Sequence, residues 1–226
     1  YLTSTDKQRQ ASYEESFAKA SIAFASALEK LTLITSENPL LSEQLTSLAA
    51  LEQRYFSESA NAMANYKEQT NAEQERKEST RRFQQLQTDL RVGMVEYVNE
   101  QGSMVVKVLA KGYFLKLKEI QAITSDALAS EDIAMIKKAL KDNKRSVTRL
   151  NFSYKSIATQ VEGMKEAFDK PTKQFLRDVG KKGGILDQHL QFIKARKKLY
   201  DNIAILATEV NQAMVILETF RMEAEK

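Results

Sequence analysis

The sequence predicts an all-α fold, an elongated antiparallel bundle of long helices. Two observations lead to this prediction. Gly and Pro together supply 9 of the 226 residues, which leaves few positions for tight turns. Apolar residues also recur at alternating spacings of four and three along most of the chain. That alternation is the period of about 3.5 residues at which helices pack side by side in a left-handed bundle.

The first two helices are predicted over 3–35 and from Pro39 to about residue 75. Asn38 is expected to cap the second helix, with Pro39 in its first position. Residues 67–82 contain one apolar residue, Ala72, and are either an exposed helix end or a connection. The expected inward-facing residues are Tyr13, Phe17, Ala20, Phe24, Leu28 and Leu31 in the first helix, and Leu41, Leu45, Leu48, Glu52, Tyr55, Ser59, Ala62 and Tyr66 in the second.

Three further helical segments are predicted over 81–128, 131–168 and 185–225, which makes five, or six if Gly102 breaks the third. The fourth has an unbroken repeat from Ile136 to Phe168, and Asp169-Lys-Pro171 is expected to end it. Gly180–Gly184 is expected to form a turn. The predicted stripe of the last helix is Leu186, Leu190, Ile193, Lys197, Tyr200, Ile203, Ala207, Val210, Met214 and Leu217.

The composition argues against catalysis. The chain has no Cys and one His, and His189 has no Glu three residues before it, so thiolate chemistry and paired Glu-x-x-His metal sites are excluded. No phosphate-binding loop or dinucleotide fingerprint occurs. We therefore expect a protein that is not an enzyme and that uses no metal or cofactor. No uncharged apolar run approaches the roughly 18 residues of a membrane span.

The charge is uneven along the chain. Residues 1–100 carry 11 basic and 15 acidic side chains, whereas residues 101–226 carry 23 and 15. Basic clusters occur at 137–149 and 194–198. Each is either a solvated helix face or a surface that attracts anions. Because no nucleic-acid-binding motif accompanies these clusters, a nucleic-acid partner is not expected.

Polar residues at three predicted core positions, Glu52, Asn143 and Lys197, are the informative departures from the pattern. Each either fixes helix register or lines a polar cavity between helices. Arg residues beside the same stripes favour a small organic acid, because a guanidinium donates two parallel hydrogen bonds to a carboxylate. The candidate ligand-binding residues are Arg54, Tyr55, Tyr66, Asn143, Arg145, Arg149, Arg196 and Tyr200.

Two stretches carry a family resemblance. They are Leu31–Leu41, followed by Leu45, Leu48 and Tyr55, and Ile123–Ile133, followed by Asn143, Leu150 and Tyr154. With the length and the helical pattern, they resemble the extracytoplasmic sensor domains of bacterial methyl-accepting chemotaxis proteins, and the helical bimodular type is the one they are most similar to. The resemblance covers nearly the whole chain.

The resemblance implies one periplasmic sensor domain over residues 1–226, set between two transmembrane helices of an inner-membrane receptor. It implies six helices in two stacked four-helix bundles, a homodimer, and a small metabolite bound between helices. Binding would shift the last helix toward the membrane. If both ends face the membrane, the number of helical traverses must be even, so five segments imply a missed break near Gly102 or within 169–184. The rival function is a helical scaffold or a module that binds anionic membrane surfaces.

Overall fold

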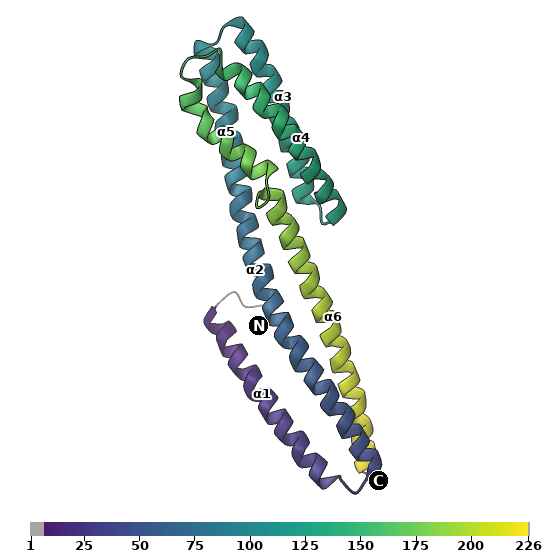
Figure 1. Ribbon diagram of the computed structural model, residues 1–226. Coiled ribbons are helices and arrows are strands. Elements are labelled where there is room, and N and C mark those ends of the chain that lie inside the picture. The colour runs from purple at the N-terminus through teal and green to yellow at the C-terminus, as the bar shows by residue number, and fades with distance from the viewer. Residues whose placement is uncertain (1–6, 226) are drawn as a thin grey trace. The chain divides into compact units, whose positions relative to one another are not determined.

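The computed structural model describes residues 7–225, and this part of the chain is α-helical without a strand, which confirms the predicted all-α class. Its six helices are α1 (Lys7–Ile34), α2 (Pro39–Gln101), α3 (Met104–Ala129), α4 (Ile133–Ala158), α5 (Met164–Gly180) and α6 (Ile185–Ala224) (Figure 1).

The start of α2 is as predicted, but its end is not. Asn38 Oδ1 accepts hydrogen bonds from the backbone N–H groups of Leu40 at 3.1 Å and Leu41 at 3.3 Å. The polar segment 67–82 is not a connection, because α2 continues through it to Gln101. This segment is rich in Glu, Gln, Lys and Arg, which favour helix without burial, and Lys77 pairs with Glu73 one turn away at 2.8 Å.

Four short connections separate the helices from α2 to α6. Three of them contain glycine, and the fourth, residues 130–132, ends in Asp132, which caps α4. Gly102 ends α2, and Ser103 caps α3 by accepting from the Val106 N–H at 3.4 Å. The expected end at Asp169-Lys-Pro171 is wrong: α4 already ends at Ala158, Gly163 lies in the left-handed region at φ 73°, and Pro171 sits inside α5. Burial of Phe175 and Val179 downstream outweighs the hydrogen bond that Pro171 removes. Gly180–Gly184 forms the predicted turn before α6.

The chain divides into two compact units, formed by residues 1–69 with 195–226 (unit 1) and by residues 70–194 (unit 2). Their charges differ in sign. Unit 1 carries 11 basic and 14 acidic side chains, and unit 2 carries 23 basic and 16 acidic ones. The excess of positive charge in this protein therefore belongs to unit 2.

Unit 2 has an extensive apolar core. In it α4 packs against α3 on one side and α5 on the other (Figure 1). The repeat predicted over 136–168 faces inward, and so do the apolar residues that recur at the same spacing over 83–124. Asn143, the polar member of the second repeat, is fully buried and donates from Nδ2 to Thr124 Oγ1 at 2.9 Å. The fully buried large side chains are Tyr113, Phe175, Leu90, Met94, Leu117, Ile120, Ile136, Leu150, Ile157, Met164, Ile185 and Leu186.

Unit 1 has a smaller core, in which Leu28 of α1 and Leu45 and Leu48 of α2 meet Ile216 and Phe220 of α6. The stripe predicted for α2 faces inward. The stripe predicted for α6 is wrong from Lys197 onward, because its members there are exposed. The residues of α6 that face the other helices each lie one position earlier in the sequence. Both sets repeat at the same period, so periodicity alone does not distinguish them.

Gly163 gives a test of the α4–α5 turn. A Cβ at Gly163 would lie against the hydroxyl of Tyr97, which donates to the Glu162 carbonyl at 2.7 Å. Gly163→Ala should lower the free energy of unfolding by about 1–3 kcal/mol because of its left-handed backbone and this clash. In a Tyr97→Phe background the clash is relieved and the cost should shrink.

Urea denaturation measures both costs. Gly112→Ala in α3 is the control: its nearest neighbour would be Lys116 Nζ at 3.8 Å, so this helical substitution should be neutral or stabilising. Equal costs for Gly163→Ala in the two backgrounds would contradict the described contact.

Candidate functional site

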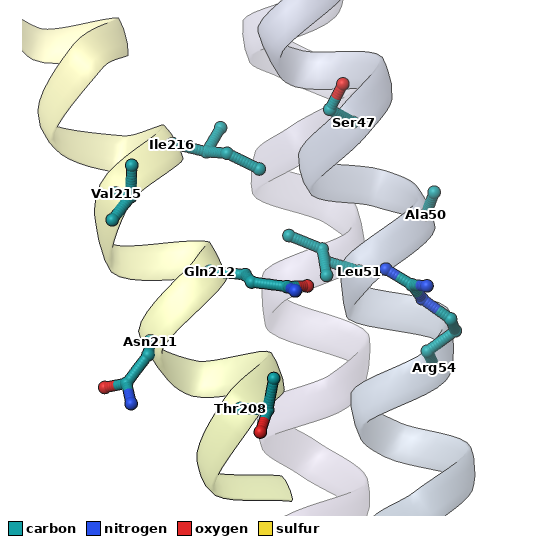
Figure 2. Close-up of a pocket in the computed structure, with 9 residues that line it drawn as sticks. All are labelled: Ser47, Ala50, Leu51, Arg54, Thr208, Asn211, Gln212, Val215 and Ile216. Atoms are coloured by element: carbon teal, nitrogen blue, oxygen red, sulfur yellow. The ribbon is translucent and has the colours of Figure 1, made fainter. Parts of the chain in front are cut away.

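A groove in unit 1 lies between α2 and α6, and we call it the Arg54 groove. It has a volume of about 650 Å³. Figure 2 shows the amide of Gln212 extending from α6 toward α2, and the Arg54 side chain lying along α2 beside Leu51. The groove is lined by Ser47, Ala50, Leu51 and Arg54 of α2 and by Thr208, Asn211, Gln212, Val215 and Ile216 of α6.

Arg54 is the charged group of this groove, and its partner is Glu209 on α6. Arg54 Nε lies 3.6 Å from Glu209 Oε2, a distance that gives an ion pair but no hydrogen bond. The Arg54 side chain is 60% exposed and that of Glu209 is 12% exposed. Glu209 Oε2 is buried without a hydrogen-bond partner among the described residues. The pair is thus incompletely satisfied, and a better-placed carboxylate can compete with Glu209 for the guanidinium.

The neutral groups of the groove suit the same kind of ligand. The amides of Asn211 and Gln212 and the hydroxyl of Ser47 can donate or accept hydrogen bonds. Leu51 and Ile216 supply apolar wall. One cation, a few neutral polar groups and an apolar wall match a small organic acid with a short carbon chain.

A second hollow of about 260 Å³ lies among α1, α2 and α6 and is nearly all apolar. It shares Leu51 with the Arg54 groove, and Glu209 is among the residues that line it. Tyr55 and Glu52, both singled out from the sequence, line it together with Phe24 and Met214. Its chemistry suits an apolar group rather than a carboxylate.

Polar contacts continue along α2 and α6 beyond Arg54. Asn202 accepts a hydrogen bond from Asn65 and donates one to Glu58 at 2.8 Å. Lys198 pairs with Glu68 at 3.2 Å. Such partly exposed pairs contribute about 0–1 kcal/mol each, so this seam between α2 and α6 is held less firmly than an apolar core.

The eight residues predicted for the ligand site are not gathered in one pocket. Arg54 lines the groove, Tyr55 the apolar hollow, and Arg149 a separate hollow of about 460 Å³ in unit 2. Tyr66, Arg196 and Tyr200 belong to unit 1, with Tyr200 60% exposed. Asn143 is buried against Thr124, and Arg145 is exposed on α4, both in unit 2.

Sequence reasoning missed Glu209, Asn211 and Gln212. They lie on α6 beside Val210, which the periodicity assigned to the core but the structure leaves 42% exposed. The available signal was Glu209 itself, a charged residue within the apolar run from Ile203 to Phe220. Lys197, predicted at a core position, is exposed.

Unit 2 contains a buried hydroxyl cluster formed by Tyr113 of α3, Tyr154 of α4 and Thr172 of α5. All three oxygens are buried and lack a well-formed hydrogen bond within residues 7–225. Burial, and secondarily the neighbouring Tyr154, raises the pKa of Tyr113, while Thr172 opposes the rise. Burial and then the negative charge of Asp169 raise the pKa of Tyr154 to about 12.

Three features of the described residues bear on metal binding and on membrane insertion. Residues 7–225 contain no group of three or more His, Cys, Asp or Glu placed to hold a metal ion. His189 is buried, with Nε2 2.9 Å from the Ser130 carbonyl oxygen. The segment Met164–Ala224 includes one 18-residue window that is apolar enough to cross a membrane, with a mean hydropathy of 1.3, and none of that window is buried.

The hydroxyl cluster makes stability depend on pH. An unfolded tyrosine ionises near pH 10, whereas Tyr154 in the folded chain stays neutral until about pH 12. The unfolded state therefore loses its proton first, and the free energy of unfolding should fall across this window by about 1.4 kcal/mol per pH unit for each such tyrosine. Below pH 10 the contribution is complete.

Denaturant titrations of the wild type and of Tyr113→Phe/Tyr154→Phe at several pH values test this dependence. The double variant should show a shallower fall than the wild type. The phenolate absorbance that appears near pH 12 should diminish by one tyrosine in Tyr154→Phe alone. Identical slopes in the two proteins would show that the cluster does not control the titration.

Comparison with family models, with curated proteins and with solved structures yields no match for this chain.

Proposed function

We propose that this chain is the ligand-sensing domain of a transmembrane chemoreceptor of the methyl-accepting type, and that it binds a small organic acid in the Arg54 groove. The observation that carries the proposal is the position of Arg54 in the groove between α2 and α6, 3.6 Å from a carboxylate oxygen, Glu209 Oε2, that accepts no hydrogen bond from the described residues. The domain acts without catalysis, as a periplasmic part of an inner-membrane protein.

The signal arises from exchange of one carboxylate for another. A ligand carboxylate that makes two hydrogen bonds to Arg54 displaces Glu209, which loosens one of the polar contacts between α2 and α6. Ligand binding then favours the position of α6 in which the groove has the higher affinity for the ligand. A ligand shifts a conformational equilibrium only through such a difference in affinity. The resulting movement of α6 is passed to a flanking transmembrane helix.

In this proposal the two units are the two modules of a bimodular sensor. In unit 1, α1 runs antiparallel to α2, since Glu14 pairs with Lys67 while Leu28 meets Leu45. Helix α6 also runs antiparallel to α2, since Asn202 bonds to Glu58 while Phe220 packs in the cluster with Leu45. The first residues of α1 and the last residues of α6 therefore lie at opposite ends of unit 1. A receptor anchored directly through both α1 and α6 would need these ends at the same end of unit 1, so this topology argues against anchoring through both of them.

Isothermal titration with a panel of small organic acids and amines tests the ligand class. An acid should bind to the wild type, and Arg54→Gln should weaken it by about 10–100-fold, because a charged hydrogen-bonding group is lost. Arg54→Lys should bind more weakly than the wild type, since it lacks the planar fork. Arg221→Gln, near the far end of α6, is the matched control and should bind normally.

Two results would overturn this assignment. Binding of amines with no acid bound contradicts the charge argument. Acid binding that survives Arg54→Gln but is lost in Arg149→Gln places the site in the hollow of unit 2 instead.

The homodimer is proposed to form through the outward apolar stripe of α6. Met214 is 63% exposed, and Val210 and Leu217 are 42% and 46% exposed, although all three lie on one face. Met214→Lys/Leu217→Lys should raise the dimer dissociation constant by at least about tenfold in sedimentation experiments. Met135→Lys in unit 2, where Met135 is 49% exposed, should not. A wild-type chain that stays monomeric at high concentration would refute this interface.

A further inference from the structure

The outer face of α4 carries a concentration of positive charge that no ion pair with another described residue neutralises. Seven of its residues are basic and one, Asp142, is acidic. All seven are exposed. The basic residues are Lys137, Lys138, Lys141, Lys144, Arg145, Arg149 and Lys155. We call this surface the α4 basic face.

None of these seven side chains forms an ion pair with any residue from 7 to 225. Elsewhere in this part of the chain basic residues do form ion pairs, including Lys67 with Glu14 and Arg82 with Asp178. Lys137, Lys141 and Arg145 also follow one another at four-residue intervals, and like charges at that spacing destabilise a helix. The array therefore has no counterpart within the described residues and disfavours the helix that carries it.

The α4 basic face has one specific feature, a hollow of about 460 Å³ beside Phe152. Phe152 is 74% exposed and lies near the C-terminal end of the basic face, between Arg149 and Lys155. Arg149 and Ser153 of α4 and Lys116 of α3 line the same hollow, so three donors surround a space next to an aromatic ring. An aromatic ring beside Arg is typical of the centre of a protein–protein interface.

The opposite face of α4 decides between a protein and a membrane as the occupant. Ile136, Leu150 and Ile157 are fully buried against the rest of unit 2, so α4 has no free apolar face to insert into a bilayer. What it exposes is a row of cations, about 27 Å long at the helical rise, with one exposed ring, Phe152, near its C-terminal end. This arrangement fits an acidic protein surface with an apolar recess for Phe152.

We propose that the α4 basic face is a docking surface for an acidic partner protein, with one partner carboxylate held by Arg149 and Lys116 in the hollow beside Phe152. The lysines along α4 pair with further carboxylates and speed association, whereas Arg149 and Phe152 set the lifetime of the complex. This surface is separate from the Arg54 groove and does not depend on the organic-acid proposal.

Fluorescence anisotropy with two labelled peptides of about twelve residues tests the proposal, one made of Glu alone and one of Glu with two central Leu residues. Both should bind at low salt and weaken as salt rises, and the Leu-containing peptide should bind more tightly. The charge-reversal variant Lys141→Glu/Arg145→Glu/Arg149→Glu should weaken both peptides by at least about tenfold. Phe152→Ala should weaken only the Leu-containing one.

The matched control reverses three exposed lysines of unit 2 outside α4, in Lys165→Glu/Lys170→Glu/Lys182→Glu. It has the same net charge as the α4 variant and should keep nearly wild-type affinity. Circular dichroism should show both variants folded, because all six positions are exposed.

Three outcomes would overturn the proposal. If the two triple variants lose the same affinity for the peptides, net charge alone explains the binding. No difference between the peptides, or no effect of Phe152→Ala, would remove the role of Phe152. Tighter binding to phosphatidylglycerol vesicles than to either peptide, abolished by the α4 variant, would assign the face to membranes.

Discussion

The packing of α4 between α3 and α5 is the interaction on which unit 2 depends. The 4–3 repeat of α4 commits one face of the helix to the core, where Ile136 and Leu150 are completely buried. Every basic side chain of α4 is then confined to the opposite face. Asn143 is accommodated in the core by its hydrogen bond to Thr124, which ties α4 to α3 at one register. A strongly amphipathic helix in this position produces both a firm core and an exposed cationic surface.

Unit 1 follows a different principle, because polar contacts take the place of much of the apolar core. Arg54 with Glu209 and Asn202 with Glu58 join α2 to α6 through side chains that water partly reaches. Such contacts exchange readily with ligands and with solvent, whereas buried apolar contacts do not. The unit with the smaller core is therefore the one whose helices a small charged molecule can most easily displace.

Much of the fold was predictable from the sequence because helix period and capping are local signals. The Asn38 cap, the Gly180–Gly184 turn and the inward faces of α2, α3 and α4 are as expected. The errors lie where long-range packing overrides local rules, as at Pro171 inside α5. The candidate ligand residues lie beside apolar repeats, and a repeat within one helix does not show which other helix it faces. Arg54 was identified, but its partner Glu209 was not.

The two apolar stripes of α6 have a consequence for its rotational register. They lie one residue apart, which corresponds to a turn of about 100° around the helix axis. If apolar burial alone decided, Ile203 and Val210 would face α2 as favourably as the present inward residues. Selection of the observed setting therefore falls to Asn202 and Glu209, whose polar partners lie on α2. In α6 the polar residues therefore specify the rotation of the helix about its axis, and the apolar residues alone do not.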